Sequence, residues 1–363
     1  MIDSPLYKEV DWMLIALLLL NSLIGVIVIY SASHYLPGNI YLKQLFWIIL
    51  SSLAFIMIIS IDYKILVAYS VYFYFFCIAL LLGLQLFGRI IAGTTRWLKI
   101  AFLQLQPSEV MKIVVILILT RVFSEFKKKS LTWNKVLVAA GIVALPFLLI
   151  ALQPNFGTAF TFVPILLAAF LLAGLNRKVI VFLLICAVLV GVATWNFFLQ
   201  DYQKKRIATL LSPGSDPLGA GYHILQSKIA IGSGGLLGKG YKKGTQSQLR
   251  FLPARHTDFI FSVIGEEFGF LGVGVIFFSY FLLLSRLFNS VKKSRDRAGV
   301  FITFMVSVMI AFQFFVNVMI VIGLFPVTGI PLPFLSYGGS SLLTNYLAVG
   351  LVLNVTMRRF VNV

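Results

Sequence analysis

The chain reads Trp12-Met-Leu-Ile-Ala-Leu-Leu-Leu-Leu-Asn-Ser-Leu-Ile-Gly-Val-Ile-Val-Ile-Tyr-Ser-Ala-Ser33 near its beginning, and this stretch contains no charged residue. About 20 such residues in a helix cross the roughly 30 Å hydrocarbon core of a bilayer. Because that core offers no water to the backbone, a run this continuously apolar is typical of a membrane helix. Asp3, Glu9 and Asp11 precede it, and no small-residue cleavage site follows. We therefore expect a retained helix instead of a signal peptide.

Further apolar runs follow the first one. The 363 residues are 60% hydrophobic and 12% charged, which excludes an ordinary soluble domain. These features predict an all-α integral membrane protein, a single polytopic domain over residues 1–363 with ten transmembrane helices. The expected helices lie at Trp12–Ser33, Leu42–Ile61, Leu66–Phe87, Pro107–Phe123, Val136–Leu152, Gly157–Gly174, Val179–Phe198, Phe259–Phe288, Ala298–Phe325 and Ser341–Met357.

The loops between these runs carry unequal charge. With the N-terminus in the cytoplasm, the inner loops hold most of the Lys and Arg residues of the short loops, as the positive-inside rule requires. Ten crossings then return the C-terminus to the cytoplasm. The long outer loop Leu199–Thr257, between helices seven and eight, is also basic, although loops of this length largely escape the rule. Its charge indicates a phosphate-bearing or anionic-lipid ligand, or simple attraction to lipid headgroups.

One acid stands at the entry to the eighth run, in the stretch Phe251-Leu-Pro-Ala-Arg-His-Thr-Asp258-Phe-Ile-Phe261. An ionisable residue at the membrane edge costs free energy unless it faces water or a partner, which makes Asp258 a candidate functional residue. Glu266 and Glu267 follow about two helical turns later, roughly 12–13 Å along a helix axis. We expect these two acids to line the same polar cleft as Asp258.

A second polar stretch precedes the fourth run. It contains Arg96-Trp97 and then Gln106-Pro-Ser-Glu109, with Lys112 one turn later. A proline suits the first turn of a helix, and the helix dipole favours an acid there. One interpretation is therefore capping with a Glu109–Lys112 pair at i, i+3. The other is a direct functional role for Glu109.

The outer loop between residues 226 and 248 is rich in Gly and Lys. Its spacing matches neither the P-loop nor the dinucleotide-binding pattern, which excludes ATP and NAD sites of those kinds. Backbone amides around Lys239 can still surround a phosphate.

A third unusual stretch, Phe325-Pro-Val-Thr-Gly-Ile-Pro-Leu-Pro-Phe-Leu-Ser-Tyr-Gly-Gly-Ser-Ser341, lies between the last two runs. Its prolines and glycines preclude a regular helix. Apolar non-helical backbone at membrane depth is tolerated only where it is buried in protein or lines a wet cavity. We therefore expect a re-entrant or cavity-lining segment over residues 325–341.

Taken together and in this order, these motifs, with Gly244-Thr-Gln-Ser-Gln248, resemble the SEDS family (shape, elongation, division and sporulation). The resemblance spans nearly the whole chain and is closer to the elongation branch, RodA, than to the division branch, FtsW. It implies a peptidoglycan glycosyltransferase of the bacterial inner membrane that polymerises lipid II for cell elongation and rod shape. It also implies that Asp258 is the catalytic aspartate. The implied partners are lipid II, a class B penicillin-binding protein transpeptidase and membrane lipid, but no nucleic acid.

The implied chemistry fits one acid among many cations. The acceptor hydroxyl needs a base such as Asp258, and the lipid pyrophosphate leaving group needs positive charge. Single displacement would invert an α-linked donor to a β-1,4 product. A divalent cation, magnesium or manganese, is compatible as a cofactor, but the sequence assigns it no ligand. We expect these residues to bind substrate: Arg96, Glu109, Lys112, Lys239, Gln248, Arg255, His256, Glu266, Ser336 and Ser340.

Two positions depart from the family pattern. Ala254 stands where a glutamate usually precedes the Arg-His-Thr-Asp motif, and Asn155 stands where a Pro-Asp-Leu-Gly turn has its aspartate. Both changes remove negative charge near the expected cleft, which leaves an inactive scaffold as one alternative. A lipid II flippase is another, with Gln313 and Asn317 lining a path. Hydrogen bonding between helices is the simpler explanation of these two amides.

Overall fold

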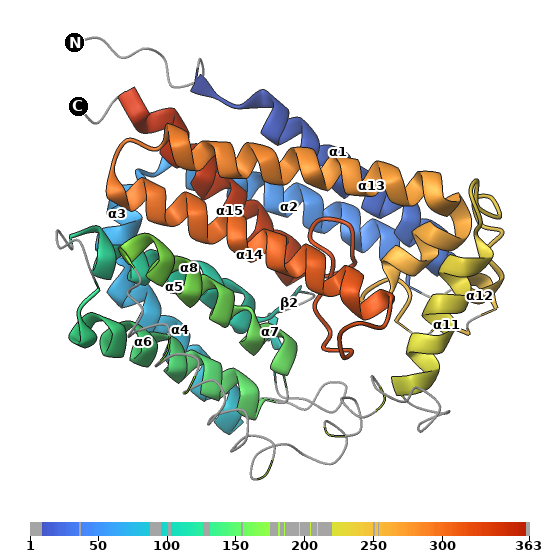
Figure 1. Cartoon of the computed structure of the whole chain (residues 1–363), viewed down its shortest axis with the longest axis horizontal. Helices are drawn as coiled ribbons and strands as arrows, with labels where there is room; N and C mark the ends of the chain where they lie inside the picture. Colours follow the sequence, from blue (N-terminus) through green and yellow to red (C-terminus); the bar gives the residue numbers. More distant parts are fainter. Residues whose placement is uncertain are drawn as a thin grey trace.

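The computed structural model describes residues 9–35, 38–87, 96–100, 103–125, 131–153, 155–174, 220–249, 251–252 and 254–360, with single positions 181, 185, 196, 204 and 209. Helices make up most of the described structure (Figure 1). They are α1 (Trp12–Ser33), α2 (Ile40–Ser60), α3 (Tyr63–Ala68), α4 (Ser70–Phe87), α5 (Pro107–Ser124), α6 (Trp133–Leu152), α7 (Phe156–Phe160), α8 (Phe162–Gly174), α11 (Ala220–Ser233), α12 (Thr245–Gln248), α13 (Ile260–Lys293), α14 (Arg297–Val321), α15 (Gly339–Met357) and the 3-10 turn η4 (Arg358–Phe360).

Eight segments are long and apolar enough to cross a membrane: α1, α2, α4, α6, α7 with α8, α13, α14 and α15. The expected multi-pass helical membrane protein is thereby confirmed. The expected helix Pro107–Phe123 is α5, which is largely buried in the bundle and also carries Glu109, Lys112 and Arg121. The expected helix Val179–Phe198 lies outside the described residues, apart from single positions.

The most deeply buried of the long helices are α15, α5 and α14. Helix α15 packs against α2 and α14, while α14 also contacts α5, α8 and α13. Outer helices instead expose large apolar side chains, such as Tyr72, Phe75 and Phe87 on α4. This pattern, with exposed aromatics on the periphery and a tightly buried interior, suits a bundle whose solvent is lipid.

A short antiparallel hairpin, which was not predicted from the sequence, precedes α5. Strand β1 (Leu98–Ile100) pairs with β2 (Leu103–Leu105), with Leu98 opposite Leu105. The hairpin leads directly to the cap of α5 at Gln106. Its position connects Arg96 and Trp97 to the first turn of that helix.

The segment between α14 and α15 contains no helix and is largely buried from Leu332 to Ser336. It passes close to two helices because each has a glycine at the contact. A Cβ atom on Gly25 would lie 2.7 Å from Leu335 O, and one on Gly157 would lie 2.2 Å from Thr328 O. Any larger residue at either place would push the segment away from the bundle.

Helix α13 is broken at Gly269, where φ is 63° and ψ is −158°. The break leaves backbone groups without partners in the helix, and residues 235–240 supply these partners. Lys239 N and Gly240 N donate to Glu266 O and Glu267 O, both at 3.0 Å. In return, Phe270 N donates to Gly235 O at 2.9 Å. The sequence predicted one uninterrupted helix here, over Phe259–Phe288.

Candidate functional site

A cavity of about 220 Å³ lies where the β-hairpin, the start of α5, α7, the turn before α13 and the segment 329–341 meet. Segments far apart in the sequence therefore contribute to one small space. Its lining residues are Arg96, Trp97, Gln106, Glu109, Asn155, Thr158, Thr257, Asp258, Gly329, Pro331, Tyr337, Gly338, Ser340 and Ser341. Of the residues expected to act on substrate, Asp258, Arg96, Glu109 and Ser340 are in this wall.

Asp258 lies two residues before α13 and is partly exposed to the cavity. The turn that carries it is closed by Thr257 N and Phe259 N, which donate to Ala254 O at 3.1 and 3.3 Å. The backbone of Gly329 faces the carboxylate, since a Cβ atom there would lie 3.8 Å from Asp258 Oδ2. The carboxylate thus lies in the cavity opposite Gly329, a position of the neighbouring segment that has no side chain.

Glu109 and Lys112 form an ion pair of 2.7 Å in the first turn of α5. Both side chains are almost completely buried. The local pairing expected from their spacing is therefore present, and Glu109 lines the cavity as well. Such a pair is held at a considerable desolvation cost, so removing either partner would leave an uncompensated buried charge.

Arg96 and Ser340 lie on the wall formed by the hairpin and α15. The Arg96 guanidinium carbon is 5.9 Å from the centre of the Trp97 ring, a distance typical of a cation–π contact. Ser340 Oγ accepts a hydrogen bond from Gln106 N at 2.9 Å and donates to Gln104 O at 3.2 Å. Ser340 therefore holds residues 104–106, which lead into α5, against α15. Arg96 brings a permanent positive charge to the cavity.

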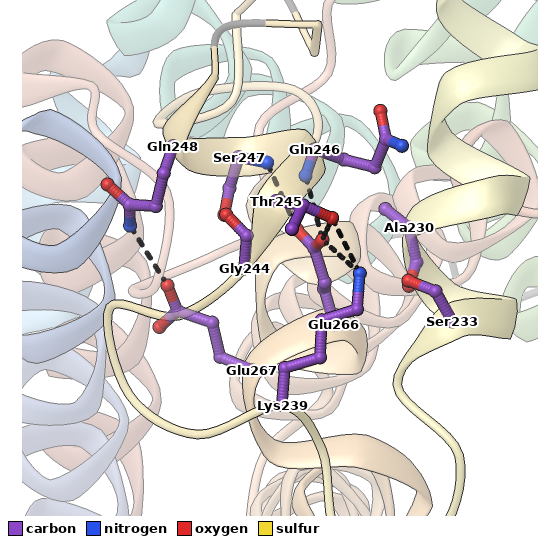
Figure 2. A network of polar contacts seen from close by, with 10 residues as sticks. All are labelled: Ala230, Ser233, Lys239, Gly244, Thr245, Gln246, Ser247, Gln248, Glu266 and Glu267. Atoms are coloured by element: carbon purple, nitrogen blue, oxygen red, sulfur yellow. Dashed lines mark hydrogen bonds and ion pairs between the residues drawn. The ribbon is translucent and has the colours of Figure 1, made fainter.

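The structure places Lys239, Glu266 and Gln248 in a different cluster (Figure 2). Lys239 Nζ lies 2.9 Å from Glu266 Oε1, and Gln248 Nε2 donates to Glu267 Oε1 at 3.2 Å. Glu266 also accepts the backbone N–H groups of Gln246 and Ser247, at 2.8 and 3.0 Å. Neither acid lines the Asp258 cavity, contrary to the expectation of one shared cleft. The two carboxylates instead hold residues 239–248 on α13.

Arg255 and His256 also lie outside the cavity wall, although they adjoin Asp258 in sequence. The buried Arg255 side chain donates from Nε to Ala32 O at 2.6 Å and from a terminal nitrogen to Ser247 O. Burial, with a smaller contribution from the positive Arg255, lowers the pKa of His256 below its usual value of 6.5. The imidazole is therefore neutral at pH 7. Ser336 donates from Oγ to Thr257 O at 2.6 Å and supports the turn from behind.

The sequence matches the family model of the FtsW, RodA and SpoVE proteins, described as cell cycle proteins, over residues 11–360. The chain belongs to this family.

Relatives of known name are similar over nearly their whole length. The peptidoglycan glycosyltransferase MrdB of Escherichia coli (strain K12) is 37% identical, over 99% of this chain and 98% of the relative. The peptidoglycan glycosyltransferase RodA of Treponema pallidum (strain Nichols) is 32% identical, over 97% and 98%.

Solved structures of the family have the same fold. A chain from a structure on the coordination of polymerization and crosslinking by a peptidoglycan synthase complex is 31% identical, with a TM-score of 0.83 over 97% of this chain and 98% of the other. Thermus thermophilus rod shape determining protein RodA is 27% identical, with a TM-score of 0.73 over 98% and 99%. The resemblance read from the motifs is confirmed.

The two departures from the family pattern differ in their position. Asn155 is 4% exposed and lines the cavity, where its Nδ2 has no hydrogen-bond partner among the described residues. Ala254 is exposed, adopts a positive φ of 49° and is not among the lining residues. Only the change at position 155 therefore alters the polarity of the wall itself.

Within the described part of the chain, no three His, Cys, Asp or Glu side chains form a group that could hold a metal ion. Sequence reasoning missed that Asn317 reaches the turn of Asp258, where Nδ2 donates to Asp258 O at 3.1 Å. No local pattern announces such a contact, because its partners are 59 positions apart.

Proposed function

We propose that this protein is a peptidoglycan glycosyltransferase that polymerises lipid II into glycan strands for cell elongation and rod shape. The observation that carries the proposal is the meeting of Asp258 and Arg96 in one cavity. Relatives that are 37% and 32% identical over almost the whole chain bear the name peptidoglycan glycosyltransferase, which supports it.

The cavity suits an inverting transfer. The acceptor's sugar 4-hydroxyl loses its proton to the Asp258 carboxylate while its oxygen forms a bond to C1 of the donor. The bond from C1 to the phosphate oxygen breaks, and undecaprenyl pyrophosphate leaves with the electron pair. A single displacement inverts the α-linked donor to a β-1,4 linkage. One carboxylate suffices because pyrophosphate needs charge neutralisation and little protonation.

Arg96 is the residue of choice for neutralising the pyrophosphate. It lines the cavity and carries a permanent charge, and its guanidinium can donate two parallel hydrogen bonds to phosphate. Lys239 and Arg255, expected from sequence to help, bind an acid and backbone carbonyls elsewhere. Magnesium or manganese would add positive charge at the leaving group. In this wall it would rest on Asp258, the Asn155 side-chain oxygen and substrate phosphates, since Glu109 is paired with Lys112.

The membrane arrangement forms part of the proposal. We place ten spans in the bacterial inner membrane, with both termini in the cytoplasm and the basic loop outside, on the charge distribution of the loops. The cavity then faces the outer side, where the segment 325–341 re-enters the bundle. A class B penicillin-binding protein is the proposed partner. The similar chain within a peptidoglycan synthase complex supports this choice.

The decisive experiment incubates the purified full-length protein with lipid II, alone and together with the transpeptidase, and separates the glycan products by length. We expect polymer from the wild-type protein and a loss of at least about 100-fold in Asp258→Asn, which is isosteric but cannot accept the proton. Normal polymer from a folded Asp258→Asn would refute the assignment of the base.

A flippase, the rival hypothesis, makes the opposite prediction. Lipid II would cross the membrane of reconstituted vesicles without any polymer being formed. The structure lends this rival little support, because Asn317, one of its two expected path-lining amides, is fully buried and donates to two backbone carbonyls.

A further inference from the structure

Three hydrogen bonds from the C-terminal part of the chain hold the backbone around Asp258. Tyr337 N donates to His256 O at 2.9 Å, and Ser336 Oγ donates to Thr257 O at 2.6 Å. Asn317 Nδ2 donates to Asp258 O at 3.1 Å. Three consecutive carbonyl groups are thus each tied to a residue at least 59 positions later in the chain. Such anchoring is more than a turn of this length needs in order to close, since Ala254 O already closes it.

Asn317 also holds the segment that faces the carboxylate. Its Nδ2 donates a second hydrogen bond to Ile330 O at 2.9 Å. A side-chain amide has two N–H donors, and both are used on carbonyl oxygens, so the amino end must point this way. Ile330 follows Gly329, whose backbone approaches Asp258 Oδ2. One side chain therefore sets the spacing between the carboxylate and the wall opposite it.

The surroundings of Asn317 indicate that its two hydrogen bonds have a role other than stabilising the fold. The side chain is fully buried, and its Oδ1 has no hydrogen-bond partner among the described residues. A buried amide oxygen without a partner costs free energy, and an apolar side chain of similar volume would avoid that cost. The amide is thus a poor choice for packing alone.

We propose that Asn317 is a positioning residue for glycosyl transfer, supported by Ser336. The inference rests on the proposed function, in which Asp258 is the base. A base acts only when it lies within hydrogen-bond reach of the proton, and a displacement of about 1 Å can cost about 100-fold in rate. Asn317 acts through Asp258 and does not touch substrate. Ser336, expected from sequence to bind substrate, instead holds the turn that carries Asp258 through its hydrogen bond to Thr257 O.

The test compares two buried amides on the same helix. Gln313 lies one turn before Asn317 on α14, is 1% exposed, and makes no hydrogen bond to the Asp258 turn. Asn317→Leu and Gln313→Leu are purified as full-length proteins and assayed with lipid II. We expect kcat to fall about 10- to 100-fold in Asn317→Leu only, with KM for lipid II within about twofold of wild type. Melting temperatures of the two variants should be close.

Equal kcat values for the two variants would overturn the proposal, as would a change confined to KM. If Asn317→Leu does not fold, variants of Ser336 test the proposal instead, with kcat as the measured quantity. Ser336→Ala should lower kcat by about fivefold or more, and Ser336→Thr, which keeps the hydroxyl, should restore it. Equal kcat in Ser336→Ala and wild type would then refute positioning by this support.

Asp258→Asn, assayed in parallel, separates this inference from the function beneath it. An active Asp258→Asn refutes the base, and with it both proposals. An inactive Asp258→Asn together with a fully active Asn317→Leu refutes only the positioning role.

Discussion

At position 155 the chain has an amide where the family pattern has a carboxylate, and this amide is buried in the cavity wall with Asp258 and Glu109. Glu109 in the same wall is paired with Lys112, and Asn155 carries no charge. The wall is therefore less acidic than the family pattern implies. A cation bound here would depend mainly on Asp258 and on phosphate oxygens from the substrate, with the neutral Asn155 side-chain oxygen as a weaker ligand.

Restoring the acid tests this reading. Asn155→Asp should lower the magnesium or manganese concentration needed for half-maximal polymerisation severalfold, because a second carboxylate raises the charge of the site. The matched control is Ala254→Glu, which restores the other family acid at an exposed position outside the wall and should leave this concentration unchanged. Identical cation dependence in Asn155→Asp and wild type would show that position 155 serves only its turn.

Replacing Arg96 should mainly lower turnover, whereas replacing Arg255 should mainly lower stability. Arg96→Ala should reduce kcat/KM for lipid II by about 10-fold or more, because it removes a charge from the cavity. The exposed Lys243→Ala, in the outer loop, is the control and should change it little. Arg255→Ala should instead lower the melting temperature, because each buried carbonyl left without a donor costs about 1–3 kcal/mol. Equal, small effects of Arg96→Ala and Lys243→Ala on turnover would favour a general attraction of the basic loop to lipid.

At the scale of elements, the break in α13 explains why residues 235–240 pack directly against this helix. A helix interrupted in an apolar environment must have its free backbone groups paired by another segment. Residues 235–240 provide those partners, and Glu266 adds an ion pair to Lys239 and two bonds to the first turn of α12. Loop and helix are therefore one structural unit, so a change at the break should loosen both.

Gly269 is the position at which that unit is most vulnerable. Its backbone angles are almost restricted to glycine, and a Cβ atom there would lie 2.3 Å from Gly238 N. Gly269→Ala should lower the free energy of unfolding by at least about 2 kcal/mol. Gly274→Ala, in the same helix and with open space around its Cβ, should be neutral or slightly stabilising. Thermal melting of the detergent-solubilised proteins measures both, and equal melting temperatures would contradict this role of the break.

At the scale of the whole molecule, the start of α1 and the turn η4 lie at the same end of the bundle (Figure 1). Arg359 forms an ion pair with Glu9, while Asp11 lies 3.7 Å from both Arg286 and Lys293. These contacts join the N-terminal tail, the C-terminal turn and the last turns of α13. The outer loop packs near the other end of α13, so the two regions should lie on opposite sides of the membrane.

Thiol labelling of intact cells measures this orientation. In a protein whose Cys77 and Cys186 are replaced by alanine, Lys243→Cys should react with a membrane-impermeant maleimide. Lys293→Cys should react only after the membrane is made permeable. Both sites are partly or fully exposed, so burial does not explain a difference. The reverse pattern would invert the topology, and it would move the cavity to the cytoplasmic side.

Most of the helices were predictable because they depend on local sequence. A long apolar run in lipid has to satisfy its backbone within itself, so composition alone indicates Trp12–Ser33 and its counterparts. The caps are local as well, since Asp11 and Asp296 each accept a hydrogen bond from the backbone three residues later. Asp258 could be picked out for a similar reason, as an acid at the entry to an apolar helix. The break at Gly269 could not, because its backbone partners come from a loop about 30 positions earlier.

Only the tertiary structure decided which polar residues share the cavity. Arg255 and His256 lie within three positions of Asp258 in sequence but do not line the cavity, whereas Glu109 and Asn155, more than 100 positions away, lie in the same wall. The sequence by itself determined the membrane class, the family motifs and the acid at Asp258, because these are properties of single segments. The neighbours of that acid were decided by how α5, α7, α14 and the segment 325–341 pack together. Packing of this kind depends on the shapes of distant side chains and on glycines that allow close approach, which no single segment contains.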